Sequence, residues 1–155
     1  DAITSIGDTP SCSLTESFSG IDEIRPGNFV YYDMTQYYLG SCDFTDIAAF
    51  VACPVVAKHK DRKEIVVYCG GVHLSKEFLE IDGKPYYGEV VKWEENLVPG
   101  TLRPDSYVRS VSQEHGIIKA SETLFSQVHV GDILGIVPVH SCMTANLLRD
   151  HTTVI

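Results

Sequence analysis

Short apolar and aromatic segments, separated by glycine, proline and aspartate, constrain the fold of this chain more than any other feature. Segments rich in β-branched and aromatic residues and bounded by such turn residues are typical of strands. No segment keeps an apolar 3.6-residue period for more than about three helical turns, so helices are expected to be short. The expected strands are residues 28–33, 48–59, 63–69, 86–93, 107–113 and 133–139. Strands at such short intervals predict a mainly β fold, an antiparallel sandwich or barrel.

Two short helices are expected beside these strands. Residues 13–20 would form a turn of helix capped by Ser11 or Ser13, because a serine hydroxyl accepts hydrogen bonds from the first free N–H groups of a helix. Residues 45–49 form the second candidate, with Thr45 as the N-cap. Neither is long enough to change the fold class.

Two further features qualify the strand pattern. Pro54 lies inside residues 48–59, and because proline cannot donate to a strand ladder, it predicts a bulged strand or two strand pieces. Residues 94–105 are largely polar and contain Pro99, Gly100 and Pro104. We expect them to form a long loop, a kind of segment that is often functional or disordered.

Charge and hydropathy exclude two classes of partner. The chain has 155 residues, enough for one domain, and a net charge of −9. Nucleic acids and anionic membrane surfaces are bound by clustered lysine and arginine, so neither is an expected partner. No apolar run approaches the roughly 18–20 residues of a membrane span, and without a basic segment followed by an apolar one at the start we expect no signal peptide.

The cysteines and the first residues bear on the origin of the chain. There are 5 cysteines and no Cys-x-x-Cys spacing, which suggests neither a disulfide framework nor a zinc ribbon. We therefore expect a reduced, cytoplasmic protein. The chain begins with Asp1 rather than methionine and opens on what looks like a strand and its exit turn, so we expect a fragment or a processed product.

The sharpest chemical motif is His140-x-Cys142. Alternate residues of a strand face the same side, so a continuing strand would direct the imidazole and the thiolate to one point. Zinc takes nitrogen and sulfur ligands, and two ligands leave room for water, substrate or another protein group. The pair taken alone is a weak signal, and its alternative is a buried cysteine beside a hydrogen-bonded histidine.

Two other motifs carry possible chemistry. In the segment 112–116, Ser-Gln-Glu-His-Gly, the glycine permits a bend that would direct His115 into a cleft as a general base or metal partner. In the segment 5–11, small residues after a strand could expose backbone N–H groups to a phosphate. The alternatives are a turn histidine in the first case and a simple Gly/Pro turn in the second.

Taken in order, these motifs resemble a known family. The matching segments are GDTPSCS (7–13), GIDEIRPGNFVYYD (20–33), GGVHLSK (70–76), SQEHG (112–116) and VGDILGIVPVHSCMTANL (130–147). Their order and spacing resemble the C-terminal part of the D-threonine aldolase / D-serine dehydratase family, pyridoxal-phosphate (PLP) enzymes related in fold to alanine racemase. The resemblance implies that residues 1–33 are the last strand and turns of a PLP-binding (β/α)8 barrel. Residues 34–155 would form the C-terminal β-domain with the metal site.

The resemblance also implies roles for individual residues. Gly7, Asp8 and Thr9 match a loop near the PLP phosphate. His140 and Cys142 match a pair that binds a divalent metal, and with a cysteine present Zn²⁺ is a better candidate than Mn²⁺. The SQEHG segment matches one close to the active site, which makes His115 a secondary catalytic candidate.

The implied activity is that of a lyase acting on D-3-hydroxy amino acids, either a dehydratase or an aldolase. No lysine lies where the family anchors PLP, so we expect the anchor in a missing N-terminal barrel portion, an inactive chain without it, and a homodimer in the full enzyme. Three alternatives remain open: a racemase-like PLP enzyme, a non-catalytic β-domain that serves folding or dimerisation, and a free-standing zinc hydrolase. The last needs a third ligand, which His115 or His73 would have to supply.

Overall fold

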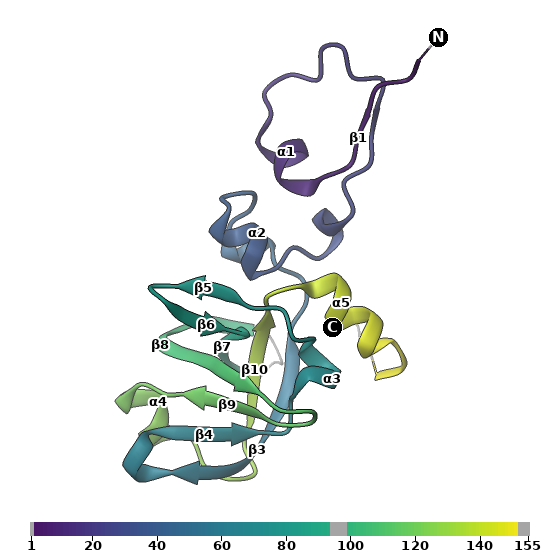
Figure 1. The fold of residues 1–155 in the computed structure, drawn as a ribbon. Helices are drawn as coiled ribbons and strands as arrows, with labels where there is room; N and C mark the ends of the chain where they lie inside the picture. The colour runs from purple at the N-terminus through teal and green to yellow at the C-terminus, as the bar shows by residue number, and fades with distance from the viewer. Residues whose placement is uncertain (1, 94–98, 152–155) are drawn as a thin grey trace.

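A closed antiparallel barrel dominates the computed structural model, which describes residues 2–93 and 99–151 (Figure 1). The strands follow one another around the barrel in the order β10-β3-β4-β9-β8-β7. Their bounds are β3 (Val51–His59), β4 (Glu64–Val67), β7 (Gly88–Trp93), β8 (Pro99–Val111), β9 (Gly116–Lys119) and β10 (Ile133–Pro138). The expected mainly β fold with an antiparallel barrel is confirmed.

Alternation along the strands fills the barrel interior. In β3, Val51, Cys53 and Val55 are buried, whereas the residues between them are exposed. The same inside-outside alternation is what a pleated strand with one buried face requires. The pairing of β3 with β4 shifts register between Val55 and Ala57, so the bulged strand expected from Pro54 is confirmed.

A second apolar cluster covers the outside of the barrel. Met34, Ile47, Val91 and Val137 are buried together, with aromatic side chains packed around them. Met34 begins helix α2 (Met34–Tyr38), which lies between the barrel and the N-terminal segment (Figure 1). Burial on both sides explains why β10 is buried at every position but its first.

The remaining elements are short, as the sequence predicts. The helices are α1 (Thr9–Leu14), α3 (Gly71–Leu74), α4 (Glu122–Gln127) and α5 (Ser141–Leu147), with single turns η1 (Asn28–Val30), η2 (Phe44–Asp46), η3 (Lys60–Arg62) and η4 (Arg149–His151). Strands β5 (Leu79–Ile81) and β6 (Lys84–Tyr86) form a hairpin, and β1 (Ser5–Ile6) pairs in parallel with β2 (Glu23–Ile24). Within the described ranges no helix is long and apolar enough to cross a membrane.

The strand expected over residues 28–33 is wrong. Residues 28–30 form the turn η1, and Tyr32 has a left-handed φ of 48°. Asp33 holds this turn, because its carboxylate accepts hydrogen bonds from Asn28 Nδ2 as well as from the Gln36 N–H at the start of α2, and residues 28 and 33 are thereby brought together.

Both expected helices are displaced. The expected 13–20 helix is instead α1 at residues 9–14, because the Asp8 carboxylate accepts the Ser11 N–H and a proline favours the first turn. The expected 45–49 helix is the turn η2 at 44–46, which Asp43 rather than Thr45 caps. An aspartate that precedes the expected serine or threonine is the N-cap in each case, and the Asp43 N–H donates to Asp46 Oδ2.

The long loop expected over residues 94–105 is wrong for its second half. Residues 94–98 lie outside the described residues, but β8 begins at Pro99. Pairing explains the difference, because Pro99 lies opposite Trp93 and Leu102 opposite Val91 in β7. A partner strand therefore orders a segment whose composition favours a loop. The proposed boundary between residues 1–33 and 34–155 stays a prediction.

Candidate metal site

The His140-x-Cys142 pair lies where β10 leaves the barrel and α5 begins. The strand ends at Pro138, His140 is the residue before α5, and Cys142 lies in its first turn. The expectation that the two residues alternate along a strand is therefore wrong. The helix starts here because the His140 carbonyl accepts the Thr144 N–H and the Ser141 N–H is satisfied by Asp33.

His140 is held through one ring nitrogen. Its Nδ1 lies 2.5 Å from Oε2 of Glu77, and both side chains are partly exposed. A carboxylate only accepts hydrogen bonds, so this contact favours the tautomer with the proton on Nδ1. In the neutral ring Nε2 then has its lone pair available for a cation.

Cys142 lies in a half-buried, electronegative position. Its Sγ is 3.4 Å from Oδ1 of Asn28. Burial, with a contribution from the negative charge of Asp33, raises the pKa of the Cys142 thiol. The same negative surroundings favour a cation, whose binding would displace the thiol proton. The nitrogen and sulfur donors therefore fit a divalent metal of the zinc type.

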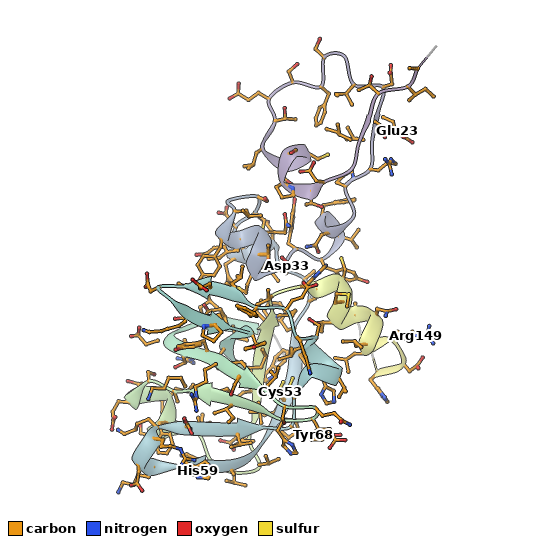
Figure 2. The ribbon with its side chains drawn as sticks, in the orientation of Figure 1. Glu23, Asp33, Cys53, His59, Tyr68 and Arg149 are labelled. Carbon is orange, nitrogen blue, oxygen red and sulfur yellow. The ribbon has the colours of Figure 1, made fainter. Side chains whose placement is uncertain are left out.

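Asp33 connects the N-terminal segment to this corner of the barrel. Its buried carboxylate accepts hydrogen bonds from Asn28 Nδ2 (2.5 Å), Gln36 N (2.9 Å) and Ser141 N (3.1 Å). Figure 2 shows Asp33 at the junction of the two parts. Sequence reasoning missed it, although an aspartate three residues before a glutamine is a capping signal that would have identified the start of α2.

The GGVHLSK and SQEHG motifs pack against each other. The Gly71 N–H donates to Ser112 O at 2.8 Å, and Val72 N–H donates to Gln113 O at 3.1 Å. A Cβ on Gly70 would lie 2.5 Å from Gln113 O, so only glycine fits there. The two motifs thus form one unit at the end of the barrel where the metal pair lies, since α3 packs against α5.

His115 lies in this unit against an aromatic ring. Its imidazole is edge-on to Tyr68 at 5.6 Å, and Tyr68 in turn contacts His73 at 5.2 Å. Figure 2 shows Tyr68 at the end of β4. In the part of the chain that the structure describes, no three His, Cys, Asp or Glu side chains are grouped to hold a metal. A third ligand from His115 or His73, which a free-standing zinc hydrolase needs, is therefore not found among these residues.

A hollow of about 460 Å³ lies between the joined motifs and α5. Its lining includes Gly71, Lys76 and Ser112 from the joined motifs and Met143 from α5. Met143 directly follows Cys142 in the chain, although the lining of the hollow includes neither His140 nor Cys142. Lys76 provides it with a cation that suits a carboxylate.

The Gly7-Asp8-Thr9 turn offers mixed features to a phosphate. A Cβ on Gly7 would lie 3.9 Å from the guanidinium carbon of Arg25, so a cation is close to an open backbone. However, the Asp8 carboxylate already accepts the Ser11 N–H, and the hydroxyl of Thr9 accepts the Asn28 N–H. The hydrogen bond from Ser11 also lowers the pKa of Asp8, so its negative charge opposes a phosphate at this turn.

Comparison with known proteins gives a consistent answer. Residues 48–154 match the family model of the putative serine dehydratase domain. A D-serine dehydratase from Dictyostelium discoideum is 33% identical over 95% of this chain, which spans 38% of that relative.

Solved structures agree with this match. The crystal structure of an Ala racemase-like protein from Idiomarina loihiensis has a TM-score of 0.79 at 33% identity, covering 94% of this chain and 38% of that one. D-threo-3-hydroxyaspartate dehydratase from Delftia sp. HT23 has a TM-score of 0.80 at 25% identity, covering 94% and 39%. Two variants of that dehydratase are also similar in structure. One has alanine in place of a cysteine and is in the metal-free form. The other has alanine in place of a histidine, and one residue separates that histidine from the cysteine. The chain belongs to the putative serine dehydratase domain family.

Proposed function

We propose that this chain is part of a PLP- and metal-dependent lyase that eliminates water from a D-3-hydroxy amino acid. The observation that carries the proposal is the His140–Cys142 pair, which presents a nitrogen and a sulfur donor at the start of α5. Relatives named as dehydratases of D-serine and of D-threo-3-hydroxyaspartate support the reaction class. The dehydratase variant without its cysteine, in the metal-free form, supports a metal role for Cys142.

His140 and Cys142 would hold a divalent metal, for which Zn²⁺ is the better match and Mn²⁺ the alternative. When bound, the metal supplies a Lewis acid for the substrate's β-hydroxyl, which helps hydroxide to leave. Asp33 fixes the first turn of α5 by accepting the Ser141 N–H. Its negative charge would also offset part of the charge of a metal bound at Cys142.

PLP, when bound, withdraws the electrons released at the substrate's Cα. We propose that its lysine anchor lies outside this chain and that Gly7, Asp8 and Thr9 line its phosphate end. The Arg25 guanidinium beside Gly7 supports a phosphate contact. Because the Asp8 carboxylate is negatively charged, the turn would contact the phosphate through its backbone N–H groups and not through the Asp8 side chain. His115, half-buried at the end of the barrel, is proposed as a secondary acid-base group.

The N-terminal segment fits a larger partner structure. Residues 2–32 expose several large apolar side chains, namely Ile3, Leu14, Phe18, Ile24, Phe29, Val30 and Tyr31. A barrel built on residues 1–33 would cover them. We further propose that the intact enzyme is a cytoplasmic homodimer.

The test is an assay of the intact protein with D-serine, D-threo-3-hydroxyaspartate and D-threonine. Dehydration releases a 2-oxo acid and ammonia, whereas an aldolase releases an aldehyde and glycine. His140→Ala and Cys142→Ala are expected to lose bound Zn²⁺ and at least about 10²-fold in kcat/KM. His129→Ala is the matched control, since His129 precedes the opposite end of β10 and contacts Asp132.

The alternatives give other outcomes. A racemase-like enzyme would interconvert amino-acid enantiomers and keep its activity in EDTA, because the metal pair would be idle. A non-catalytic β-domain would take up no Zn²⁺ or Mn²⁺ even within the intact protein. Either result would overturn the proposed lyase.

A further inference from the structure

We infer that Glu77 is a positioning residue for His140, holding the imidazole so that Nε2 faces the metal. The inference rests on the proposed metal function and goes beyond it, because it assigns a role to a residue outside the His140-x-Cys142 motif. The motif sequence does not mark Glu77, which lies 63 residues earlier in the chain.

The contact has the geometry of a carboxylate that orients a metal-binding histidine. The Oε2 to Nδ1 distance is 2.5 Å, and an ionised carboxylate accepts the Nδ1–H. Such partners fix both the tautomer and the plane of the ring, and their loss costs roughly 10–100-fold in metal affinity. Fold stability is a weaker explanation, because the two side chains are 37% and 54% exposed and exposed pairs contribute little.

The backbone before Glu77 is built to place it. Ser75 is buried and has a left-handed φ of 70°, a conformation that non-glycine residues rarely adopt. Its Oγ accepts the Glu77 N–H at 3.2 Å. A strained serine that holds the next turn by its side chain fixes the position of the following carboxylate.

The same backbone is anchored to the SQEHG segment. Two hydrogen bonds from Gly71 and Val72 to Ser112 and Gln113, and the close approach of Gly70, join α3 to that turn. Glu77 follows α3 and His140 directly precedes α5, and these two helices pack against each other. We assign to the two joined motifs the task of holding Glu77 against His140.

The first experiment measures metal affinity in the intact protein. Co²⁺ is titrated into the metal-free protein, and the thiolate-to-cobalt absorption reports binding through Cys142. Glu77→Ala is expected to weaken Co²⁺ binding by about 10–100-fold. Glu77→Gln keeps an acceptor oxygen and is expected to lose less. Glu80→Ala, which removes an exposed glutamate from β5, is the matched control and is expected to bind Co²⁺ as the wild type does.

The second experiment reads the tautomer without any metal. Nitrogen-15 NMR of the metal-free intact protein at alkaline pH is expected to show His140 protonated at Nδ1. Glu77→Ala should shift the ring toward the Nε2–H tautomer, an effect that a merely structural role would not produce.

The outcomes separate this inference from the proposed function. If His140→Ala abolishes Co²⁺ binding but Glu77→Ala has wild-type affinity, or if wild-type His140 carries its proton on Nε2, the role of Glu77 is overturned and the metal site stands. A wild-type protein that binds no Co²⁺ or Zn²⁺ overturns both.

Discussion

The barrel buries most of its apolar side chains, whereas the N-terminal segment leaves most of its large apolar side chains exposed. In the barrel, residues such as Ile65, Val90 and Ile118 are fully buried, and closure leaves no unpaired sheet edge. In residues 2–32, Thr9 alone is buried, and the β1–β2 pair is only two residues long on each strand. The comparison teaches that burial in the barrel supplies most of the chain's stability, while the segment leaves most of its large apolar side chains exposed.

The largest expected change in stability comes from comparing Gly70, at the end of the barrel, with Gly27 in the N-terminal segment. Gly70→Ala forces a Cβ to within 2.6 Å of backbone atoms of Gln113 and Glu114, which cannot move away without breaking the motif contacts. We expect a loss of about 3 kcal/mol in the free energy of unfolding, measured by urea denaturation. Gly27→Ala has open space around its Cβ and is expected to change stability by less than about 0.5 kcal/mol. Equal losses of stability in the two variants would contradict the claim that the barrel, and not the segment, supplies most of the chain's stability.

The junction between the two regions is the next test. Asp33→Ala leaves the N–H groups of Gln36 and Ser141 and the amide of Asn28 without their acceptor. Because these groups lie in or near a buried position, we expect the free energy of unfolding to fall by about 2 kcal/mol. Asp22→Ala removes one exposed hydrogen bond from Thr4 and should have little effect. Urea denaturation compares the two, and a neutral Asp33→Ala would show that the junction contributes nothing to stability.

The stability of the barrel is expected to depend on pH through one buried carboxylate, Glu64, whose two arginine partners are partly exposed. Glu64 is buried and bonded to Arg62 and Arg109, each at 2.7 Å. The Arg62 hydrogen bond, helped by the Arg109 charge, lowers the pKa of Glu64 from its ordinary 4.5. A lowered pKa contributes stability above pH 4.5 that is lost as the pH falls through the folded-state value.

The variant that isolates this contribution is Glu64→Gln. At pH 7 it is expected to be about 1 kcal/mol less stable than the wild type, and the difference should shrink as the pH is lowered below 4.5. Thermal denaturation over this pH range measures it. Glu23→Gln, in the exposed pair with Arg25, is the control from the segment and should show no measurable change. A constant difference at all pH values would mean that the Glu64 charge is not involved.

The sequence predicts the barrel well because its signals are local. Alternation in residues 51–55 and the proline that predicts a bulge are local signals. The structure confirms the alternation and has the register shift between Val55 and Ala57. The 28–33 segment shows the limit of this reasoning. Its aromatic residues favour a strand, but the Asp33 cap and its long-range contact with Ser141 make the chain turn. A contact across more than 100 residues cannot be seen in local composition.

The candidate site was predictable only in part for the same reason. The His140-x-Cys142 motif is a short-range signal and identifies the donors. Their geometry was not predictable, because the helix start at Ser141 depends on Asp33. Glu77 was missed because the fold alone brings it to His140.

The smallest expected effect addresses the segment itself. Ile24 is 46% exposed in β2, so Ile24→Ala should cost this chain less than about 0.5 kcal/mol. Ile65→Ala, in the barrel core, is the matched control and should cost about 3 kcal/mol. Repeating the Ile24 substitution in the intact protein then sharpens the comparison. If residues 1–33 belong to a PLP-binding barrel, Ile24 is covered there, and the same change should cost more than it does in this chain. An equally small cost in both would argue that the segment stays exposed and is not part of such a barrel.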